Sequence, residues 1–522
     1  MSKNRQPSKK IFDFDWLIAL LYSLRPDLHA LFRKNDKAAL ALVKWLLFAG
    51  RKECRIFSES PYLKNILSRP LKPLNVTPLE ALIYHERPDV QKAFPLPAKL
   101  DDFKSWFYKH GVDEHKVLDL LNEDDLLHYQ KHHPEIFPIK EEDISKTYDA
   151  DARPYGVNLI GHAFGQLGIG EDLRMTAKAL QIAQIPFTII DFPPGPGIPQ
   201  NDMSMAEYVG KEAPYAFNII CLTALETGRL YAERGSSLFE DHFNIGYWPW
   251  ELAKWPTAWK QLIPLVDEIW VSSRHIYDAV SPISIVPTLI MPLAVDISSI
   301  SSLKRADFSL PEDAYLFCFS FDLNSSIYRK NPMACIRAFQ KAFPATLQLD
   351  KPVGLIIKCH SPARQDKNWT GLKELAREDP RIHIIEKTLA REDLLALYSC
   401  CDCYMSLHRA EGFGRGIAEA LLLGLDVIAT DYSGNVDFCR ENPAAHMASY
   451  NMVPVKDGEY PFGDGQLWAN VNEDHVAELM RECHSKPGSG IKQIKKVVDP
   501  RMAARRYSDR LKIIWKEFSR KP

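Results

Sequence analysis

Residues 403–430 read CYMSLHRAEGFGRGIAEALLLGLDVIAT. Two short apolar runs, Cys403–Leu407 and Asp426–Thr430, predict buried strands, and the segment between them opens a helix. A strand, a helix and a second strand in this order predict parallel pairing, with the helix packed on one face of the sheet. The acidic and glycine-rich residues between the first strand and the helix therefore lie at the carboxyl end of that strand.

The same alternation of strands and helices extends over most of the chain. Further strands are predicted over Gly156–Ile160, Phe187–Ile190, Phe217–Cys221, Asn244–Tyr247, Glu268–Val271, Ala314–Ser320, Val353–Lys358 and Ile382–Ile385. They predict an α/β chain with two Rossmann-like, doubly wound domains over residues 151–300 and 301–522. Ligands of such sheets bind at the carboxyl ends of the strands, so we expect the site in a cleft between the two domains.

Residues 1–150 lack this alternation and are predicted to be an all-α region. Four anchors recur at a period of about 61 residues, pairing Arg25–Leu28 with Arg87–Val90, Ala30–Phe32 with Lys92–Phe94, Trp45 with Trp106, and Gly50 with Gly111. The run Thr77–Glu80 is a capping box with proline at the first helical position, and it opens a helix. This region is either a docking module for a partner, membrane surface or acceptor, or a structural appendage.

The composition is that of an ordinary globular protein. Of 522 residues, 46% are hydrophobic and 25% charged, which excludes a disordered, collagenous or coiled-coil protein. The formal net charge of −2 gives no sign of nucleic-acid binding, which usually needs a basic excess. Neither a secretory signal nor a membrane-spanning run is recognised, so we expect a cytoplasmic protein.

The loop after Leu407 carries the strongest chemical signal. Glu411 lies at the strand end, and Gly412 and Gly414, which flank Phe413, free backbone amides at the helix start to face phosphate or sugar oxygens. Glu419 follows about two turns later, where a carboxylate can accept hydrogen bonds from a ribose diol. Two acids and free amides around one helix start suit a sugar nucleotide. His408 is near the same strand end, and Ser433 and Asn435 follow the next strand and add candidate contacts.

A second candidate is the adjacent pair Arg329 and Lys330, in the loop between the strand Ala314–Ser320 and a helix starting near Pro332. Arginine offers forked donors and lysine a point charge, so together they can hold a diphosphate. The alternative is a solvated pair of loop cations.

A third candidate is the glycine-rich loop Gly161–Gly170, which follows the strand Gly156–Ile160 and precedes a helix expected from Glu171. The positive end of that helix indicates an anion or substrate site, and the candidate residues are His162, Gly165, Gly168 and Gly170. The spacing is not G-x-G-x-x-G, so it does not support nicotinamide binding. Glycines needed only for turn geometry are the alternative.

Together, these three motifs resemble those of the retaining glycosyltransferases of family 4, also called group 1. The segment Glu411–Glu419 is similar to the E-x7-E signature of the family, Arg329 and Lys330 match its basic pair, and Gly161–Gly170 resembles its glycine-rich loop. The resemblance covers about residues 151–522. It implies a GT-B fold with a last helix, about Met502–Phe518, that crosses back to the first Rossmann-like domain.

The resemblance also implies roles for individual residues. Glu411 would contact the donor sugar, Glu419 the ribose, and Arg329 and Lys330 the diphosphate. One departure concerns the strand end at Tyr247, where many members place a histidine and this chain has Trp248, Trp250 and Glu251. The Tyr-Trp-x-Trp-Glu pattern looks like that of bacterial mannosyl- or rhamnosyltransferases. Trp250 and Glu251 are therefore acceptor-side candidates, although a strand end with a helix cap is an equal alternative for Glu251; His162 and His408 are more often structural at such positions.

The resulting prediction is a retaining hexosyltransferase that uses a nucleotide sugar, GDP-mannose or similar, and a glycan or lipid-linked acceptor in bacterial surface polysaccharide synthesis. No cofactor and no metal are expected, because no Asp-x-Asp metal site stands at a suitable strand end. Residues 1–150 are the candidate contact for a membrane surface or a protein, which would make the enzyme peripheral at the inner face of the membrane. The alternatives are a non-catalytic glycan-binding scaffold and another GT-B enzyme such as a phosphorylase or epimerase.

Overall fold

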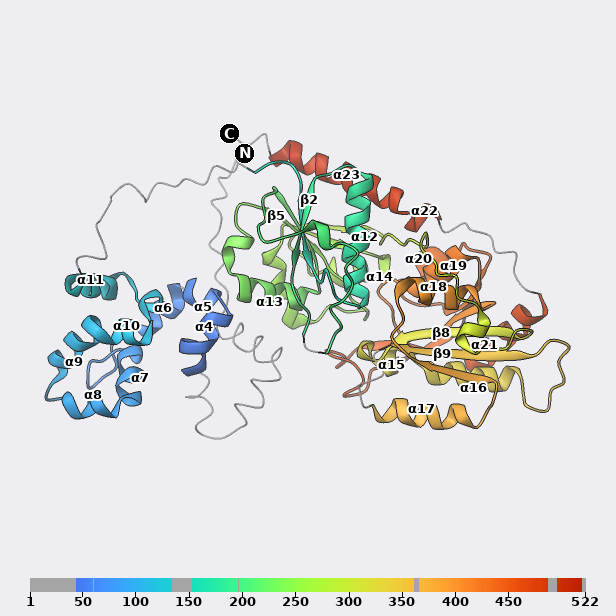
Figure 1. Cartoon of the computed structure of the whole chain (residues 1–522), viewed down its shortest axis with the longest axis horizontal. Helices are drawn as coiled ribbons and strands as arrows, with labels where there is room; N and C mark the ends of the chain where they lie inside the picture. The colour runs from blue at the N-terminus through green and yellow to red at the C-terminus, as the bar shows by residue number, and fades with distance from the viewer. Residues whose placement is uncertain are drawn as a thin grey trace. The chain divides into compact units, whose positions relative to one another are not determined.

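The computed structural model describes residues 44–59, 61–133, 153–195, 197–360, 366–486 and 495–518. These described residues fall into two compact units, one within residues 1–152 together with Leu225–His242 and the other within residues 153–224 and 243–522. The sheets of both Rossmann-like domains belong to the second unit, whose elements are labelled in Figure 1.

Short helices make up most of the described part of residues 44–133. They are η1 (Leu46–Gly50), α4 (Arg51–Glu53), α5 (Ile56–Glu59), α6 (Pro61–Leu67), α7 (Pro78–Glu86), α8 (Pro88–Ala93), α9 (Leu100–Trp106), η2 (Phe107–Gly111), α10 (Val112–His115), η3 (Leu118–Leu120) and α11 (Glu123–His132). The predicted capping box at the start of α7 is confirmed. The N–H of Glu80 donates to Thr77 Oγ1 at 3.1 Å, and the N–H of Thr77 donates to Glu80 Oε2 at 2.7 Å.

Two of the repeat anchors have the same local structure. Gly50 and Gly111 each end a five-residue π-helical segment, η1 and η2, directly after Trp45 and Trp106. In each case the tryptophan ring covers the glycine, so that an added Cβ would lie 2.8 Å from Trp45 and 3.1 Å from Trp106. A side chain would collide with the ring at Gly50 and would crowd it at Gly111, so that glycine is favoured beside the tryptophan in both places. The anchors at residues 25–32 lie outside the described residues.

The first sheet has seven parallel strands in the order β3-β2-β1-β4-β5-β6-β7. The strands are β1 (Val157–Gly161), β2 (Phe187–Asp191), β3 (Val209–Gly210), β4 (Phe217–Cys221), β5 (Phe243–Tyr247), β6 (Glu268–Val271) and β7 (Thr288–Ile290). The connecting elements are α12 (Gly168–Ile182), η5 (Ala206–Tyr208), α13 (Ala224–Arg234), η6 (Ser236–Leu238), η7 (Thr257–Leu265) and α14 (Arg274–Val280). The edge strands β3 and β7 were not predicted, because two or three residues show no periodicity.

The second sheet has six parallel strands in the order β10-β9-β8-β11-β12-β13. The strands are β8 (Tyr315–Asp322), β9 (Val353–His360), β10 (Ile382–Glu386), β11 (Cys403–Ser406), β12 (Asp426–Thr430) and β13 (Ala445–Ala448), and β14 (Tyr450–Pro454) and β15 (Leu467–Val471) form a separate hairpin. The helices are η8 (Arg305–Phe308), η9 (Leu323–Ser325), α15 (Ile327–Lys330), α16 (Pro332–Ala342), α17 (Lys367–Arg377), α18 (Arg391–Ser399), α19 (Arg415–Leu423), α20 (Val436–Cys439) and α21 (Glu473–Ser485).

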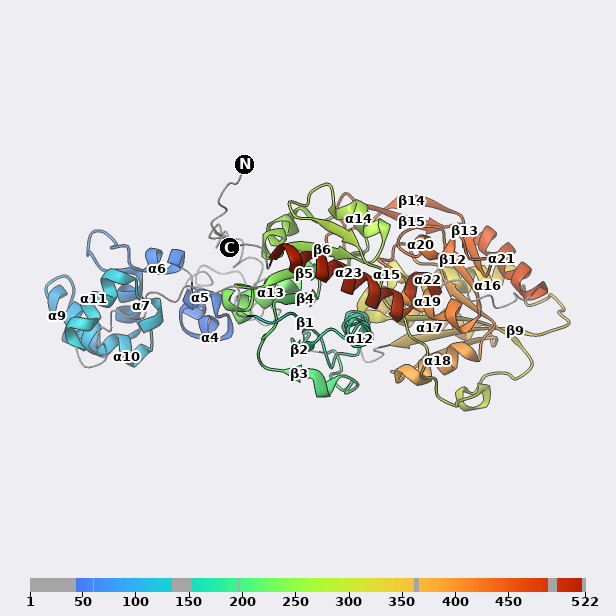
Figure 2. The same cartoon turned by 90° about the horizontal axis from the view of Figure 1, so that it is seen from above.

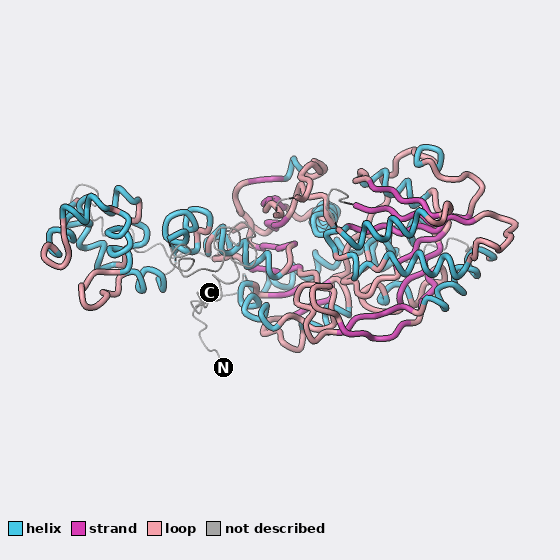
Figure 3. Tube along the Cα trace, turned by 90° about the horizontal axis from the view of Figure 1, so that it is seen from below, coloured by secondary structure: helices cyan, strands magenta, loops and turns pink. Residues whose placement is uncertain are grey.

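Helices cover both faces of the second sheet. In Figure 1, α16 and α17 lie below β8 and β9, whereas α18 and α19 lie above. In Figure 3, which is seen from below, helices in cyan lie in front of the magenta strands of this sheet. The predicted fold class, two Rossmann-like α/β domains in doubly wound form, is confirmed by the two sheets.

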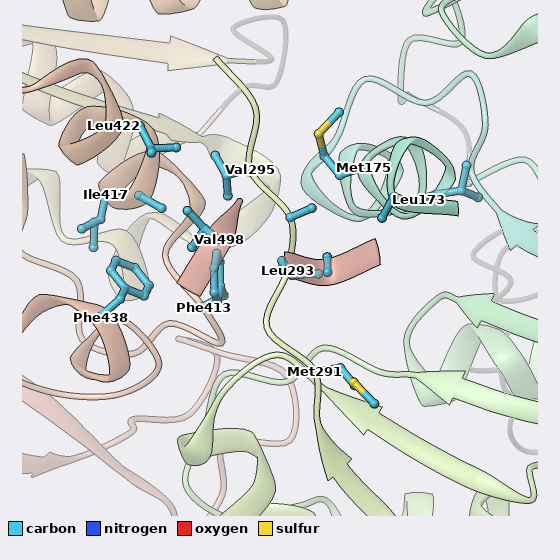
Figure 4. Close-up of a cluster of buried hydrophobic side chains, with 14 of the residues drawn as sticks. Leu173, Met175, Met291, Leu293, Val295, Phe413, Ile417, Leu422, Phe438 and Val498 are labelled. Carbon is cyan, nitrogen blue, oxygen red and sulfur yellow. The ribbon is translucent and has the colours of Figure 1, made fainter. Parts of the chain in front are cut away.

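A continuous apolar cluster joins the two Rossmann-like domains. Figure 4 shows Leu173 and Met175 of α12 near the connecting segment of Met291, Leu293 and Val295, and Ile417 of α19 on its other side. All of these side chains are at least nine-tenths buried. Apolar burial of this kind stabilises the approach of one sheet to the other and so shapes the cleft between them.

The last helices are α22 (Lys495–Val498) and α23 (Pro500–Phe518), and α23 packs beside α12 of the first domain (Figure 2). The ring of Tyr507 stacks on Trp270 of β6 at 5.2 Å, and Arg510 forms an ion pair with the fully buried Glu268. Across the described residues, no helix combines the length and the apolar character that crossing a membrane requires.

Candidate active site

A cavity of about 590 Å³ lies between the carboxyl edges of the two sheets. It is the place where an open α/β sheet normally binds its ligand. The predicted site residues that line it are Gly168, Glu251, Arg329, Lys330, Glu411, Gly412, Phe413, Gly414 and Glu419. Residues more than 240 positions apart in the chain thus share one cavity.

The centre of the cavity is an ion-pair cluster around Glu411. Arg329 Nη1 lies 3.2 Å from Glu411 Oε2, and the ammonium of Lys330 donates to Glu411 Oε1. Arg329 also donates to the carbonyl of Ala410 at 2.9 Å, and its Nη2 lies 3.9 Å from Glu251 Oε1. Glu251 accepts a hydrogen bond of 2.7 Å from the hydroxyl of Tyr460. Two cations and two carboxylates therefore meet in the cavity.

Burial and the neighbouring cations shift the pKa of Glu411 in opposite directions. Burial alone would raise its pKa, but the adjacent Lys330 and Arg329 hold the pKa of Glu411 at about 2. For Arg329, burial opposes the charged form, while Glu411 and Glu251 raise its pKa above the usual value. Glu411 and Arg329 are therefore held in their charged forms, whereas burial lowers the pKa of Lys330 despite the adjacent Glu411. Removal of either the carboxylate or the cations would leave buried charge without a partner.

Arg329 and Lys330 were predicted in a loop, and this prediction was wrong. They end the four-residue helix α15, whose start is capped by the Ser326 hydroxyl accepting from the N–H of Arg329. Asn331, with φ of 53°, ends the helix in the left-handed region and donates its side-chain N–H to the carbonyl of Leu407 at 3.0 Å. This hydrogen bond ties α15 to the end of β11 and brings both cations to Glu411.

The loop between β11 and α19 depends on close backbone contacts. A Cβ at Gly412 would lie 2.6 Å from the carbonyl oxygen of Trp250, in the first Rossmann-like domain. Gly414 adopts φ of 93°, which is strained for residues with a side chain. The carbonyl of Gly412 accepts from the Ser273 hydroxyl at 2.6 Å. The two domains therefore meet at this loop, which presents the start of α19 to the cavity.

Gly434→Ala is expected to reduce turnover by roughly 100-fold, because displacement of site groups by about 1 Å has effects of that size. An added Cβ would lie 2.0 Å from the carbonyl oxygen of Gly412, and the N–H of Gly434 donates to the carbonyl of Glu411. Gly371→Ala is the matched control, since nothing lies within 4 Å of a Cβ there. Steady-state kinetics of both variants measure the effect; equal activities would contradict the proposed importance of this loop contact.

Glu419 forms an ion pair with an arginine that also pairs with a residue of the first Rossmann-like domain. Arg391 Nη1 donates to Glu419 Oε1 at 2.8 Å, and Arg391 Nε lies 3.1 Å from Glu171 Oε1 at the start of α12. A second pair, Arg415 with Asp172, also joins α19 to α12. These four side chains were not predicted, because no local pattern indicates a pairing over such sequence distances.

The glycine-rich loop differs from its prediction in one respect. The helix expected from Glu171 begins at Gly168, so that Gly168 and Gly170 lie in its first turn and Gly165 precedes it. A Cβ at Gly170 would lie 2.4 Å from the carbonyl oxygen of Gly165, which only glycine permits. His162 is fully buried, and its Nδ1 contacts the carbonyl of Phe192. Of the predicted residues in this loop, Gly168 lines the cavity.

Several predicted residues lie behind the cavity wall. His408 is fully buried, with Nδ1 2.9 Å from Ser406 Oγ and Nε2 3.0 Å from Asn435 Oδ1, and burial lowers its pKa. Ser433 Oγ accepts from the N–H of Glu411 at 2.8 Å. Trp250 is buried, and its indole donates to the carbonyl of Lys254 at 3.0 Å. These side chains hold the loops in place and do not line the cavity in this structure.

Lys358 is a cavity residue that the sequence interpretation missed as a site. It is the sixth residue of β9 and 2% exposed, and it lines the cavity wall. A signal was present, since a lone lysine ends the apolar run Val353–Lys358 at the carboxyl end of a predicted strand. A charged side chain at that place needs a partner of opposite charge, either within the chain or in a ligand.

One group of described residues has metal-ligating chemistry. Atoms of Asp426, His446 and Cys483 lie within 4.8 Å of one another. Asp426 is the first residue of β12 and His446 the second of β13, so the group lies at the amino ends of these strands, away from the cavity. It is not part of the candidate active site, and metal independence stays a prediction.

Comparison with known proteins supports this picture. Residues 327–459 match the family described as glycosyl transferases group 1, a segment that contains Arg329, Lys330, Glu411 and Glu419. No curated protein matches the sequence.

Among solved structures, the first of the following has a TM-score above 0.5 and shows the likeness in fold. Sucrose-phosphate synthase from Thermosynechococcus elongatus has a TM-score of 0.51 at 13% identity, with 70% of this chain and 100% of that chain covered. A glycosyltransferase from Rickettsia africae has a TM-score of 0.48 at 14% identity, covering 70% and 99%. Anabaena HepE in complex with UDP and glucose has a TM-score of 0.47 at 14% identity, covering 69% and 100%. The family match and the fold together support a GT-B glycosyltransferase.

Proposed function

We propose that the chain is a retaining glycosyltransferase that moves a hexose from a nucleoside-diphosphate sugar to a glycan or lipid-linked acceptor. The observation that carries this proposal is the cluster of Glu411, Arg329 and Lys330 in the cavity between the two sheets. Cations beside the start of a helix suit a leaving diphosphate, and a carboxylate beside them suits sugar hydroxyls. The match to group 1 glycosyl transferases supports the same reading.

The chemistry follows from these groups. As the bond between the sugar and the diphosphate breaks, negative charge develops on the leaving oxygen, and Arg329 and Lys330 stabilise it electrostatically. The sugar becomes oxocarbenium-like, and the acceptor hydroxyl forms the new bond from the face that the diphosphate leaves, so the anomeric configuration is retained. The leaving phosphate oxygen takes the proton of the acceptor. No second carboxylate is then needed as a nucleophile, unlike in retaining glycosidases.

The proposed donor sugar and biological role rest on the resemblance to family 4. The Tyr-Trp-x-Trp-Glu pattern at Tyr247–Glu251 favours GDP-mannose or a similar donor and a role in bacterial surface polysaccharide synthesis. Glu251 is the acceptor-side candidate, because it belongs to the first Rossmann-like domain and lines the cavity 3.9 Å from Arg329. We place the enzyme in the cytoplasm, with residues 1–150 as the candidate contact for a membrane surface or a protein partner.

The test is a panel of UDP-, GDP- and dTDP-sugars incubated with the purified protein, with released nucleotide as the readout. We expect release from one donor and its loss in Glu411→Ala. Addition of candidate acceptors to that donor, followed by NMR of the product, then gives the linkage and the anomeric configuration. An inverted product would contradict the retaining mechanism.

The alternatives predict different results in the same assay. A non-catalytic scaffold releases no nucleotide from any donor with any acceptor, whereas it binds glycan or sugar nucleotide in calorimetry. A phosphorylase forms sugar phosphate from free phosphate, and an epimerase converts a nucleotide sugar without releasing the nucleotide. Either outcome would replace the transferase proposal.

Chelation of divalent metal is expected to leave turnover unchanged. Arg329 and Lys330 supply the positive charge that a metal supplies at other sites where a phosphate group leaves. Among the described residues, the cluster with metal-ligating chemistry, Asp426, His446 and Cys483, does not line the cavity. Turnover measured with EDTA, and after dialysis and addition of Mg²⁺ or Mn²⁺, tests this expectation. A loss of activity that metal restores would show that a metal takes part.

A further inference from the structure

Among the described residues, one cation that lines the cavity has no carboxylate partner. Six lysine and arginine side chains line it, and five of these pair with a carboxylate: Arg174, Arg329, Lys330, Arg391 and Arg415. The sixth, Lys358, forms neither an ion pair nor a hydrogen bond through its ammonium with any described residue. It is nevertheless 2% exposed. Burial of an unpaired ammonium is costly, so a partner from outside the chain is the natural explanation.

The position of Lys358 is set by the register of the second sheet. Lys358 on β9 pairs with Ser320 on β8, and both line the cavity. Alternate residues of a strand face the same side, so Lys358 shares a face with Ile356, whose side chain belongs to the apolar cluster between the domains. The neighbours Ile357 and Cys359 point into the core on the opposite face. The lysine therefore faces the cleft because the strand register holds it there.

The cations around the expected diphosphate are too few to neutralise its negative charge. Arg329 and Lys330 carry two positive charges, but Glu411 and Glu251 already oppose them with two negative charges. A diphosphate ester adds two more negative charges to a cluster that is neutral without it. The start of α19 contributes only a partial positive charge. A further cation within reach of the phosphates would reduce the excess.

We propose that Lys358 is a donor-binding residue whose ammonium pairs with the phosphate oxygens of the nucleotide. This inference rests on the function proposed above and deepens it, since it assigns a third cation to the donor site. The lysine acts in binding, by contact with the donor, and it makes no covalent step.

Titration of Lys358 is consistent with this role. Burial lowers its pKa to about 8, and the titratable groups around it are Asp322 and Cys318 on the neighbouring strand β8 and Cys359 and His360 beside it on β9. Because a phosphate raises the pKa of an adjacent ammonium, donor binding near pH 8 is expected to take up protons. Calorimetry in buffers of different ionisation enthalpy measures this uptake, which Lys358→Met should abolish.

The direct test is competitive acetylation of the full-length protein with acetic anhydride, quantified for each lysine by mass spectrometry. UDP, GDP and inorganic pyrophosphate are the probes. At roughly ten times Kd of the probe, we expect about tenfold slower acetylation of Lys358 and Lys330. Lys341 is the control, because it lies half exposed on α16 in a pair with Asp474.

Three outcomes are distinguishable. Protection of Lys358 and Lys330, with Lys341 unaffected, supports the inference. Protection of Lys330 alone overturns the role of Lys358 and leaves the proposed function standing. Protection of neither by any probe overturns both.

Substitution supplies an independent measurement. Lys358→Met keeps the length of the side chain and is expected to weaken binding of the protecting nucleotide by about 10- to 100-fold, the usual effect of a lost charge-assisted hydrogen bond. Lys358→Arg should recover part of the affinity, and Lys341→Met should have no effect. The midpoint of thermal unfolding should stay equal or rise in Lys358→Met, since a buried unpaired charge is removed. A lower midpoint with unchanged affinity would mean that Lys358 is structural.

Discussion

Lys330→Ala is expected to lower kcat by roughly 100- to 1,000-fold while the protein stays folded, the usual effect of removing one group that stabilises transition-state charge. The ammonium of Lys330 lies in the cavity wall and donates to Glu411, which Arg329 also contacts. Without Lys330, the leaving diphosphate loses a cation and Glu411 loses one of its two partners. The binding of substrate should change less than kcat, because the charge develops mainly as the bond breaks.

Steady-state kinetics with the donor found in the panel measure this effect, and circular dichroism with thermal unfolding checks the fold. Lys341→Ala is the matched control, since Lys341 pairs with Asp474 on the outside of the second domain. Lys330→Arg should retain part of the activity, because it keeps the charge with a different geometry. Wild-type turnover in Lys330→Ala would rule out the role of this lysine at the diphosphate.

Glu411→Gln is expected to abolish measurable turnover and to destabilise the protein by about 3–5 kcal/mol, the usual effect of removing one member of a buried ion pair. The amide leaves Arg329 and Lys330 buried without the carboxylate that both contact. The double variant Glu411→Gln with Lys330→Met should recover about 0.5–3 kcal/mol, the range of coupling between residues in contact. Urea unfolding of the wild type, both single variants and the double variant gives the coupling free energy. If the changes in the free energy of unfolding are additive, the interaction between Glu411 and Lys330 contributes nothing to stability.

The same carboxylate predicts a dependence of stability on pH. Its pKa is held at about 2, below the usual value of 4.5, so the charged form favours the folded state. This contribution is fully present above pH 4.5 and is lost as the pH falls toward 2. The wild type should therefore lose more stability than Glu411→Gln over this interval. Equal losses in both proteins would show that the cations do not hold the carboxylate ionised.

Most of the architecture could be predicted because its signals are local. Apolar runs such as Cys403–Leu407 identify buried strands without knowledge of their neighbours, and their alternation with helices identifies a parallel sheet. The two edge strands of the first sheet were missed, since Val209–Gly210 and Thr288–Ile290 are too short to show a pattern. The hairpin β14–β15 was missed because its strands pair only with each other, outside the βα alternation.

The candidate site could be predicted in outline for a related reason. Residues at the carboxyl ends of strands share an edge of the sheet, so Glu411 and the pair Arg329–Lys330 were expected near one another. Their direct contact depends on α15, a helix that begins at a serine cap and ends at a left-handed asparagine. Such a short helix has no periodicity, and the sequence interpretation placed it in a loop.

The sequence alone determined the class of fold, the strand ends that carry chemistry, and the residue types available there. It could do so because the spacing of hydrophobic residues and the glycine and acidic motifs are each contained in a few consecutive residues. The tertiary structure decided which charges meet. Arg391 pairs with Glu171, which lies 220 positions away in the chain, and His408 is buried in the core. Of the six lysine and arginine side chains that line the cavity, Lys358 alone has no carboxylate partner among the described residues. The physical reason is that electrostatic pairing depends on distance in space and on burial, and both are set only when the two domains pack together.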